Sequence, residues 1–459
     1  MKKQLQTLVF VAFCSILYPQ DWPMINQNFQ RTGYASDEEI LLPPLQPEKL
    51  IDLGGIPSTM IVAGDILYYI RDGFAITLYA YRLDTDQELW HFTLPGGEGT
   101  AGLVPAVWDN LIFVGGQHGE ALFALDRYSG EVIWSREVGD LYNHSPLPDG
   151  EGRLYLFADS LFCLNASDGT TIWSSTGNFN TPALFAGDLF YGNSEQIISC
   201  DASTGEINWA RNQNNHASQI IANNQGIYSC NDTTVCSYYF DAYKKWCYPL
   251  PDGIQSLHFA EGNALLADSI LVLTALNKTE NVGMLLAINV NTGEKIWDYK
   301  SNARDFFNPA GANGIVYVTG GDPSTIKGFD ITDGSLVFAD SSRNFIRQPV
   351  IAGGKLYVPN YPGVMTFSSE LSAFENLPYP VPFAYYPNPV TRHLQVKWTA
   401  DNRERCTLKL TTMTGVQVKQ IFLDGGQEYS WPMDDLPEGI YVLILTSHAV
   451  QKGYKIIKI

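Results

Sequence analysis

A recurring phrase constrains the fold of this chain more than any other feature. Each copy ends on an aromatic residue and carries an Asp or Asn eight residues earlier, as in DASTGEINW at Trp209 and NVNTGEKIW at Trp297. An Asx side chain caps the backbone just ahead of it and Gly supplies a left-handed residue, so each copy predicts a tight turn between antiparallel strands. Further full copies end at Trp134, Trp173 and Phe338, and shortened copies lie at Trp90 and around Trp246.

A second phrase, a Gly-containing or polar lead into an apolar strand, precedes each copy of the first. Its eight copies are spaced 35 to 46 residues apart. A period near forty residues that holds four short strands is typical of a propeller blade, so the spacing predicts an eight-bladed β-propeller. The copies are registered on Tyr68, Phe113, Tyr155, Phe190, Tyr228, Leu271, Tyr317 and Tyr357.

Composition agrees with a large all-β protein. The chain has 459 residues, of which 45% are hydrophobic and 17% charged, with 40 Gly and 25 Pro. Alternating β-branched and aromatic residues occur throughout, and no long helical periodicity follows the N-terminus. The net charge of −19 argues against nucleic acid or an anionic membrane as a partner, because both attract basic surfaces.

The first twenty residues have the pattern of an export signal. Lys2 and Lys3 precede an apolar run over residues 8–17 that is too short to span a bilayer. We expect a signal peptide over residues 1–20, cleaved between Tyr18 and Asp21, and no transmembrane segment elsewhere. The rival interpretation is a lipid anchor on Cys14, although Phe13 stands where such a signal has a small residue.

Cysteines cluster in the fifth repeat, at Cys230, Cys236 and Cys247. If residues 231–234 form a hairpin turn, Cys230 and Cys236 fall nearly opposite each other, and export permits a disulfide between them. The alternative is that these residues are small buried hydrophobic side chains. A metal site is not expected, since no His lies near the thiols in sequence.

Together the two phrases resemble the pyrroloquinoline-quinone-like (PQQ-like) β-propeller repeat family. The lead DWPMINQNFQRTGYA over residues 21–35 also resembles the segment that often precedes such propellers, and the resemblance covers residues 21–376. It implies that the aromatic residue ending each copy docks one blade on the next, and we expect those residues to be largely buried. They are Trp90, Trp134, Trp173, Trp209, Trp246, Trp297 and Phe338.

The tail after a Pro-rich linker (residues 377–384) has alternating strands that predict a small Ig-like β-sandwich over residues 385–459. In HLQVKW, for example, Leu394, Val396 and Trp398 share one face. YPNP, MTGVQV, LPEGIYVLIL and the Lys-rich last strand resemble the C-terminal sorting domain of the type IX secretion system of Bacteroidetes. The resemblance implies that the type IX machinery is a partner, with passage through the periplasm to the cell surface or medium. The alternative is an ordinary appended Ig-like module.

The loops that lead into the innermost strands would ring one mouth of the propeller channel, and they are rich in Asn, His, Arg and aromatic residues. Such a ring suits a polar or anionic ligand. The alternative is that these side chains only satisfy backbone groups. The candidate ligand-binding residues are His144, Asn180, His216, His258, Arg304, Asn308 and Arg347.

No nucleophile elbow, metal-spaced His pair or phosphate loop is present, so no catalytic residue is assigned. The favoured function is a secreted or cell-surface propeller that binds a protein, glycan or small ligand, or acts as a scaffold, without a cofactor. The alternative, implied by the resemblance, is a quinoprotein-type oxidoreductase with pyrroloquinoline quinone and Ca²⁺ at the channel mouth. The adjacent Cys–Cys pair that distinguishes such enzymes is absent from the sequence.

Ring closure is the final expectation. The last repeat offers three good strands, and PEKLIDLGG over residues 47–55 resembles the fourth strand of another copy. We expect Lys49 to Leu53 to pair beside GVMTFSS (residues 363–369), which would leave no unpaired edge between the first and last blades.

Overall fold

Each pair of repeated phrases folds into one antiparallel sheet of four main strands. The computed structural model describes residues 21–36, 38, 41–71, 76–95, 104–115, 121–139, 141, 145–158, 160–177, 182–193, 195–212, 219–256, 264–302, 306–321, 324–369, 383–398, 405–412, 417–424, 426–447 and 451–459. All regular elements in these ranges are β-strands, which confirms the all-β class. None of the described residues belongs to a helix of membrane-spanning length and hydropathy.

The first four sheets follow one another along the chain, and in each the strands pair in sequence order. Sheet 1 comprises β3 (Thr59–Ala63), β4 (Ile66–Arg71), β5 (Thr77–Arg82) and β6 (Gln87–Thr93). Sheet 2 comprises β7 (Ala106–Trp108), β8 (Leu111–Gly115), β9 (Ala121–Asp126) and β10 (Val132–Glu137). Sheet 3 comprises β11 (Leu147–Pro148), β12 (Arg153–Phe157), β13 (Ser160–Asn165) and β14 (Thr171–Thr176). Sheet 4 comprises β15 (Ala183–Phe185), β16 (Asp188–Gly192), β17 (Gln196–Asp201) and β18 (Ile207–Asn212).

The next four sheets repeat the pattern with small additions. Sheet 5 comprises β19 (Gln219–Asn223), β20 (Gly226–Cys230), β21 (Thr234–Tyr238) and β22 (Lys244–Pro249). Sheet 6 comprises β24 (Ala264–Ala267), β25 (Ile270–Asn277), β26 (Val282–Asn289) and β27 (Lys295–Lys300), with β23 (Ile254–Ser256) also on β25. Sheet 7 comprises β28 (Ala310–Ala312), β29 (Ile315–Gly320), β30 (Thr325–Asp330) and β31 (Leu336–Asp340), with β1 (Tyr34–Ala35) parallel to β28. Sheet 8 comprises β32 (Val350–Ala352), β33 (Lys355–Asn360), β34 (Gly363–Ser369) and β2 (Leu45–Asp52).

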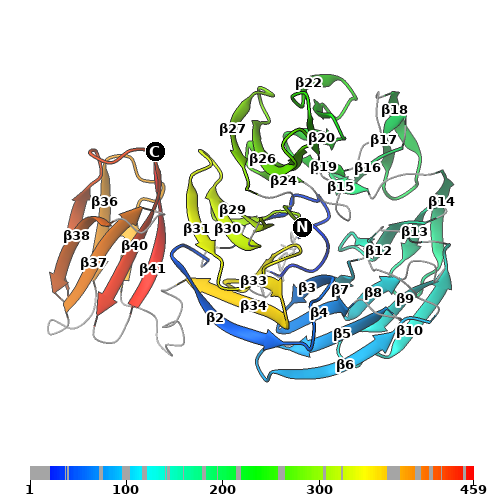
Figure 1. Ribbon diagram of the computed structural model, residues 1–459, viewed down its shortest axis with the longest axis horizontal. Coiled ribbons are helices and arrows are strands. Elements are labelled where there is room, and N and C mark those ends of the chain that lie inside the picture. Colours follow the sequence, from blue (N-terminus) through cyan, green and yellow to red (C-terminus); the bar gives the residue numbers. More distant parts are fainter. Residues whose placement is uncertain are drawn as a thin grey trace, which may run out of the picture.

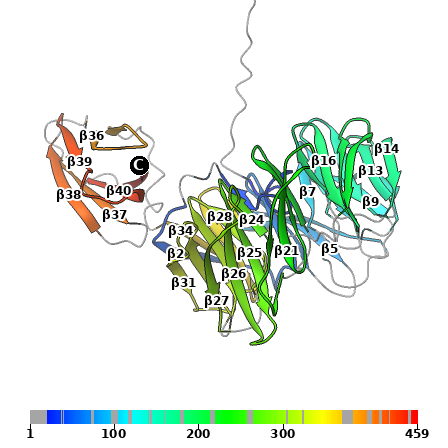
Figure 2. The same cartoon turned by 90° about the horizontal axis from the view of Figure 1, so that it is seen from above.

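The sheets surround a common axis in the manner of propeller blades, with the first strand of each sheet innermost and the last outermost (Figure 1). Edge-on, neighbouring sheets stand face to face (Figure 2). The residue on which each copy of the second phrase is registered lies in the second strand and is buried in every sheet. The cores therefore lie between sheets, where large side chains from neighbouring sheets meet.

Tryptophans dock each sheet on the next through a repeated hydrogen bond. The indole N–H donates to a backbone carbonyl of the next sheet at 2.8–3.2 Å. The acceptor is the second residue of the turn between the third and fourth strands of that sheet. Trp90 and Trp297 are buried, whereas Trp134, Trp173, Trp209 and Trp246 are half-buried. The bonds join Trp90 to Arg127, Trp134 to Ala166, Trp173 to Ala202, Trp209 to Phe240, Trp246 to Val290 and Trp297 to Ile331.

The turn glycine contributes to the same docking. Gly130 has a φ of 74°, and a Cβ added there would lie 2.6 Å from the Trp90 ring. Gly169, Gly205, Gly293 and Gly334 lie in the same way against the Trp of the preceding sheet. Glycine is thus needed both for its left-handed backbone and for the close approach of the indole.

The last two junctions of the ring use other side chains. Phe338 of sheet 7 contacts Phe367 of sheet 8 edge-on, with ring centroids 5.4 Å apart. In sheet 8, Lys49 lies at the ladder position that Trp holds elsewhere, directly after a bulge, and its ammonium pairs with Asp86 in the turn of sheet 1. Because this ion pair is exposed, we expect it to contribute little to stability.

Ring closure by the N-terminal strand is confirmed. β2 pairs antiparallel with β34 over its whole length, with Leu50 opposite Met365 and Ile51 opposite Val364. The strand begins at Leu45, four residues before the predicted start. Sheet 8 therefore joins the two ends of the ring by a backbone ladder.

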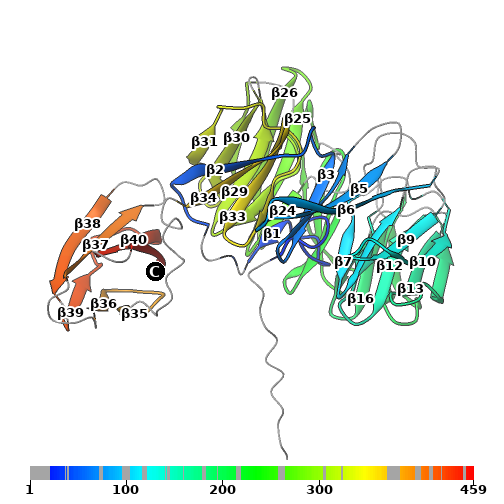
Figure 3. The ribbon, with the colours of Figure 1, turned by 90° about the horizontal axis from the view of Figure 1, so that it is seen from below.

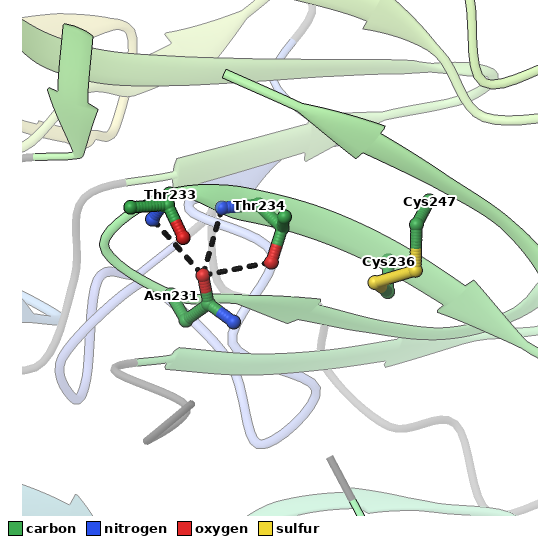
Figure 4. Close-up of a disulfide and its surroundings, with 5 residues drawn as sticks. All are labelled: Asn231, Thr233, Thr234, Cys236 and Cys247. Atoms are coloured by element: carbon green, nitrogen blue, oxygen red, sulfur yellow. Dashed lines mark hydrogen bonds between the residues drawn. A yellow bond between two sulfur atoms is a disulfide. The ribbon is translucent and has the colours of Figure 1, made fainter. Parts of the chain in front are cut away.

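The predicted disulfide between Cys230 and Cys236 is wrong. In sheet 5, Cys236 is bonded to Cys247 across β21 and β22, with a Cα–Cα distance of 4.1 Å (Figure 4), and Cys230 is buried and takes no part in a disulfide. The turn at Asn231 sets Cys230 opposite Val235, so Cys236 falls opposite Ser229. A one-residue difference in register places neighbouring side chains on opposite faces of the sheet, which separates Cys230 from Cys236.

The C-terminal residues form two facing antiparallel sheets with a core of their own (Figure 3). One contains β35 (Phe383–Tyr386), β36 (His393–Trp398) and β39 (Glu428–Pro432). The other contains β37 (Arg405–Thr412), β38 (Gln417–Asp424), β40 (Gly439–Ser447) and β41 (Gln451–Lys458). Leu394, Val396 and Trp398 are buried together, as their alternation predicts.

Replacing Trp297 by Ala removes both its packing on Gly334 and its bond to Ile331, so we expect Trp297→Ala to lose about 3–5 kcal/mol of unfolding free energy. Chemical denaturation followed by circular dichroism measures the loss. Ile296→Ala is the matched control, since Ile296 is exposed on the same strand, and it should change stability by less than about 0.5 kcal/mol. Wild-type stability of Trp297→Ala would show that the docking bond is dispensable.

Deleting residues 46–54 removes the ladder between β2 and β34 and exposes the edge of β34. We expect the ring to lose its cooperative thermal transition, because sheets 8 and 1 would no longer be joined by backbone hydrogen bonds. Differential scanning calorimetry of the deletion variant tests this expectation. A sharp transition close to that of the wild type would mean that closure rests on something other than β2.

Candidate functional site

The lead segment, residues 21–36, crosses the axis of the ring and contacts the innermost strands in turn (Figure 1). We call it the axial segment. Six innermost strands each donate one backbone N–H to its carbonyls, at 2.7–3.3 Å. The donor–acceptor pairs are Val62 to Trp22, Val107 to Pro23, Leu184 to Phe29, Ala222 to Gln30, Leu266 to Thr32 and Gly311 to Gly33.

The six donors occupy the same place in their sheets, because each is the residue before the last one of its innermost strand. In sheet 3 the matching position is Pro148. Leu147 lies opposite Tyr155 as Ile61 lies opposite Tyr68 in sheet 1, so Pro148 corresponds to Val62. Proline has no N–H, so this sheet needs no acceptor there. The axial segment therefore satisfies a ring of edge N–H groups that would otherwise face the channel.

Side chains of the axial segment tie further parts of the ring together. Arg31 is buried, and its guanidinium donates to the carbonyls of Pro182, Ser145 and Ile25 at 3.3–3.5 Å. Asn26 accepts from Gln348 of the segment before sheet 8. The resemblance of this lead was visible in the sequence, but its role was not. Trp22, Met24 and Ile25 are buried although they belong to no predicted strand, and such apolar residues outside the repeat were the available signal.

The predicted mouth residues divide into two groups. His144, Asn180, His216, His258 and Arg304 lie outside the described residues. Asn308 is buried before sheet 7, whereas Arg347 is exposed before sheet 8 with a φ of 69°. The two segments meet, because the Thr319 hydroxyl donates to the Arg347 carbonyl and Gln348 donates to Pro309. The ligand-binding role of these residues stays a prediction.

A cavity of about 730 Å³ lies among turns of sheets 1, 2 and 8, next to the start of the axial segment. The pKa of Asp21 is raised above its ordinary value, because burial disfavours the charged carboxylate. The Gly64 N–H and the Arg127 guanidinium oppose this shift. Asp21 accepts the Gly64 N–H at 2.8 Å. The lining residues are Asp21, Gly64, Asp65, Asp109, Asn110, Arg127, Tyr128 and Gly353.

Two charged groups of this cavity are engaged within the protein. Arg127 donates to the carbonyl of Ala63 at 2.7 Å and to the Tyr68 hydroxyl at 3.2 Å, so it joins sheet 2 to sheet 1. Asp65 accepts from Arg82 at 2.7 Å within sheet 1. The cavity is therefore a polar junction between sheets.

Pyrroloquinoline quinone and Ca²⁺, which the resemblance implies for the enzymes, do not fit the described part of the axis. Residues 22–33 bond across the innermost strands of six sheets and occupy the space between them. In the described residues no group of three or more His, Cys, Asp or Glu side chains could hold a metal ion. We therefore derive no step through either group.

Two family models match parts of the chain. Residues 75–178 match the family described as outer membrane protein assembly factor BamB, whose repeat is PQQ-like, and residues 384–459 match the secretion system C-terminal sorting domain. A tetrathionate hydrolase of Acidithiobacillus ferrooxidans is 30% identical over 132 residues, which make up 28% of this chain and 25% of that protein. The chain thus spans about a quarter of the length of the curated relatives it matches.

Solved structures resemble the fold over a larger part of the chain. A europium-containing methanol dehydrogenase superposes with a TM-score of 0.60 at 12% identity, over 76% of this chain and 90% of that one. BamB of Moraxella catarrhalis superposes with a TM-score of 0.55 at 15% identity, over 70% of this chain and 99% of that one. At such identities the likeness concerns the fold alone. The chain therefore carries a PQQ-like propeller repeat of the BamB type at residues 75–178 and a type IX C-terminal sorting domain at residues 384–459.

Proposed function

We propose that the protein is a non-enzymatic, eight-bladed propeller that is exported by the type IX system and binds a ligand or partner outside the cell. The axial segment carries this proposal, because the chain's own backbone crosses the axis and bonds the innermost strands of six sheets. An axis crossed in this way favours recognition on the outer surfaces of the ring. Eight sheets before residue 370 in the described part of the chain support the blade count.

The sorting domain supports a secreted or cell-surface location. On this proposal residues 1–20 are a signal peptide that takes the chain to the periplasm, and an Ig-like sandwich over residues 385–459 then engages the type IX machinery. The separate core of the C-terminal sheets supports a unit that can be recognised apart from the ring.

The second candidate is a quinoprotein-type oxidoreductase, which the methanol dehydrogenase and a quinohemoprotein alcohol dehydrogenase of Pseudomonas putida favour through their fold. The axial segment already crosses the axis through its bonds to six sheets, and the described residues include no group of three or more side chains that could hold Ca²⁺. We therefore rank this function second.

Truncation after residue 377 tests the export proposal. We expect the truncated chain to fold, since the core clusters of the ring consist almost wholly of residues before 370, but to remain in the periplasm of a host with a type IX system. Immunoblots of periplasm, cell surface and medium measure its distribution. Residues 384–459 fused to an unrelated periplasmic reporter are the reciprocal control and should carry the reporter out. Normal appearance of the truncated chain in the medium would refute the sorting role.

Incubation with pyrroloquinoline quinone and Ca²⁺ separates the two candidate functions. We expect no quinone absorbance to remain with the purified protein after desalting, and no dye reduction with alcohols or sugars, because the axial segment crosses the axis and the described residues include no cluster of metal ligands. Stoichiometric quinone retention together with dye-linked turnover would establish the oxidoreductase and overturn the binding proposal.

A further inference from the structure

The turn between β21 and β22 in sheet 5 departs from the corresponding turns of the other sheets. In sheets 2, 3, 4, 6 and 7 the turn begins with Asp or Asn and contains a Gly, whereas this one reads Tyr239-Phe240-Asp241-Ala242-Tyr243 and is one residue shorter than the turn of sheet 2. Ala242 takes the left-handed conformation, with a φ of 69°, that Gly130 takes at 74° in sheet 2. A non-glycine residue rarely holds this conformation without constraint.

Three aromatic side chains of this turn face solvent. Tyr239, Phe240 and Tyr243 are 53%, 39% and 68% exposed. The Tyr239 N–H donates to the Tyr243 carbonyl at 2.8 Å, so the two tyrosines lie opposite each other across the turn. Phe240 stacks on Phe185 of sheet 4, with ring centroids 5.4 Å apart and planes at 15°. We call these three residues the aromatic turn.

Docking of the sheets does not require these aromatic side chains. Trp209 donates to the carbonyl of Phe240 at 2.8 Å, and this bond uses only the backbone of residue 240. Residues at the matching position in other sheets, Ala166 and Ala202, accept the same bond and are buried. The sheet 2 turn carries one exposed aromatic residue, Tyr128, but the cluster of three is an addition to the repeat, and clustered exposed apolar groups mark interaction sites.

The aromatic turn is held rigidly. The disulfide between Cys236 and Cys247 joins the two strands just behind it (Figure 4). Lys245 lies over the Tyr239 ring at 4.5 Å from its centroid and donates to the Gln225 carbonyl. Arg211 of sheet 4 donates to the carbonyl of Ala242 at 2.7 Å. A platform fixed in this way loses little conformational entropy when it binds.

We propose that the aromatic turn binds a neutral glycan, whose sugar rings stack on the faces of Tyr239 and Tyr243. The C–H face of a pyranose ring matches a phenol ring in size and apolar character, and tyrosine offers contact area at low entropic cost. Asp241 and Lys244 lie within or beside the turn, where they can bond sugar hydroxyls. This inference rests on the proposed function, because it names the class of ligand that the exported binding protein would recognise.

The size of the aromatic turn favours a glycan over a protein partner. Stable protein interfaces bury roughly 1,200–2,000 Å² of total surface around a packed centre. Three partly exposed rings on a projecting turn supply only a fraction of that area, but they match two or three sugar units. Charges of both signs at the turn favour a neutral ligand over a strongly anionic one.

Native affinity electrophoresis of the full chain in gels containing laminarin, xylan, dextran, soluble starch or galactomannan tests the proposal. We expect at least one of these polysaccharides to retard the wild type. Tyr239→Ala and Tyr243→Ala should each weaken the retardation at least tenfold, because each removes a stacking face. Tyr243→Phe keeps the ring and should stay within about threefold of the wild type.

Tyr361→Ala is the matched control, since Tyr361 is 69% exposed in the hairpin of sheet 8, far from the aromatic turn in sequence. It should leave retardation unchanged, and thermal melting checks that every variant is folded. The proposal is overturned if none of the five polysaccharides retards the wild type, or if the two alanine variants bind normally. Self-association of the wild type that Tyr243→Ala abolishes, without any retardation, would instead identify a protein interface. Failure of glycan binding leaves the export experiment unaffected, so the two proposals fail separately.

Discussion

Unpaired strand edges are the constraint on which this structure depends. A ring of four-stranded sheets exposes the backbone of its innermost strands to the axis and leaves an open joint between its first and last sheets. The N-terminal part of the chain deals with both. Its axial segment accepts six N–H groups at the centre, and β2 completes the outer ladder of sheet 8. One continuous stretch, residues 21–52, thus contacts the ring at its axis and at its rim.

Contacts between sheets rely on a compact device that repeats with the sequence. A Trp indole, the carbonyl of a turn in the next sheet and the glycine of that turn form one unit, which recurs wherever both phrases are intact. The unit changes where the repeat changes. Ala242 replaces the glycine in sheet 5, and Lys49 replaces the Trp at the closing joint. The ladder of β2 makes a docking Trp less necessary there.

Sequence patterns predicted the features that depend on local chemistry. Turn residues and strand alternation located the strands and the closing strand around Leu50, because the side-chain period of a strand fixes which face is buried. The Cys236–Cys247 pairing was missed because it depends on the register between β21 and β22, which the turn at residues 231–234 does not set. The axial segment was missed because its bonds use backbone carbonyls, which leave no side-chain pattern to find. Of the candidate mouth residues, Asn308 is buried and Arg347 exposed, and sequence could not distinguish them because both precede a strand in the same kind of loop.

Closure by the N-terminal stretch also has a consequence for the order of events during folding. The backbone N–H of Leu42 bonds the Ser369 hydroxyl, 327 residues away, and Glu38 accepts the N–H of Gly354. Loops of this length form late, since their closure entropy must be met before the contact is made. The N-terminal stretch therefore gains its final partners last, when sheet 8 has formed. Until then the sheets form an open row, and the edge of β34 lacks the strand that completes its ladder.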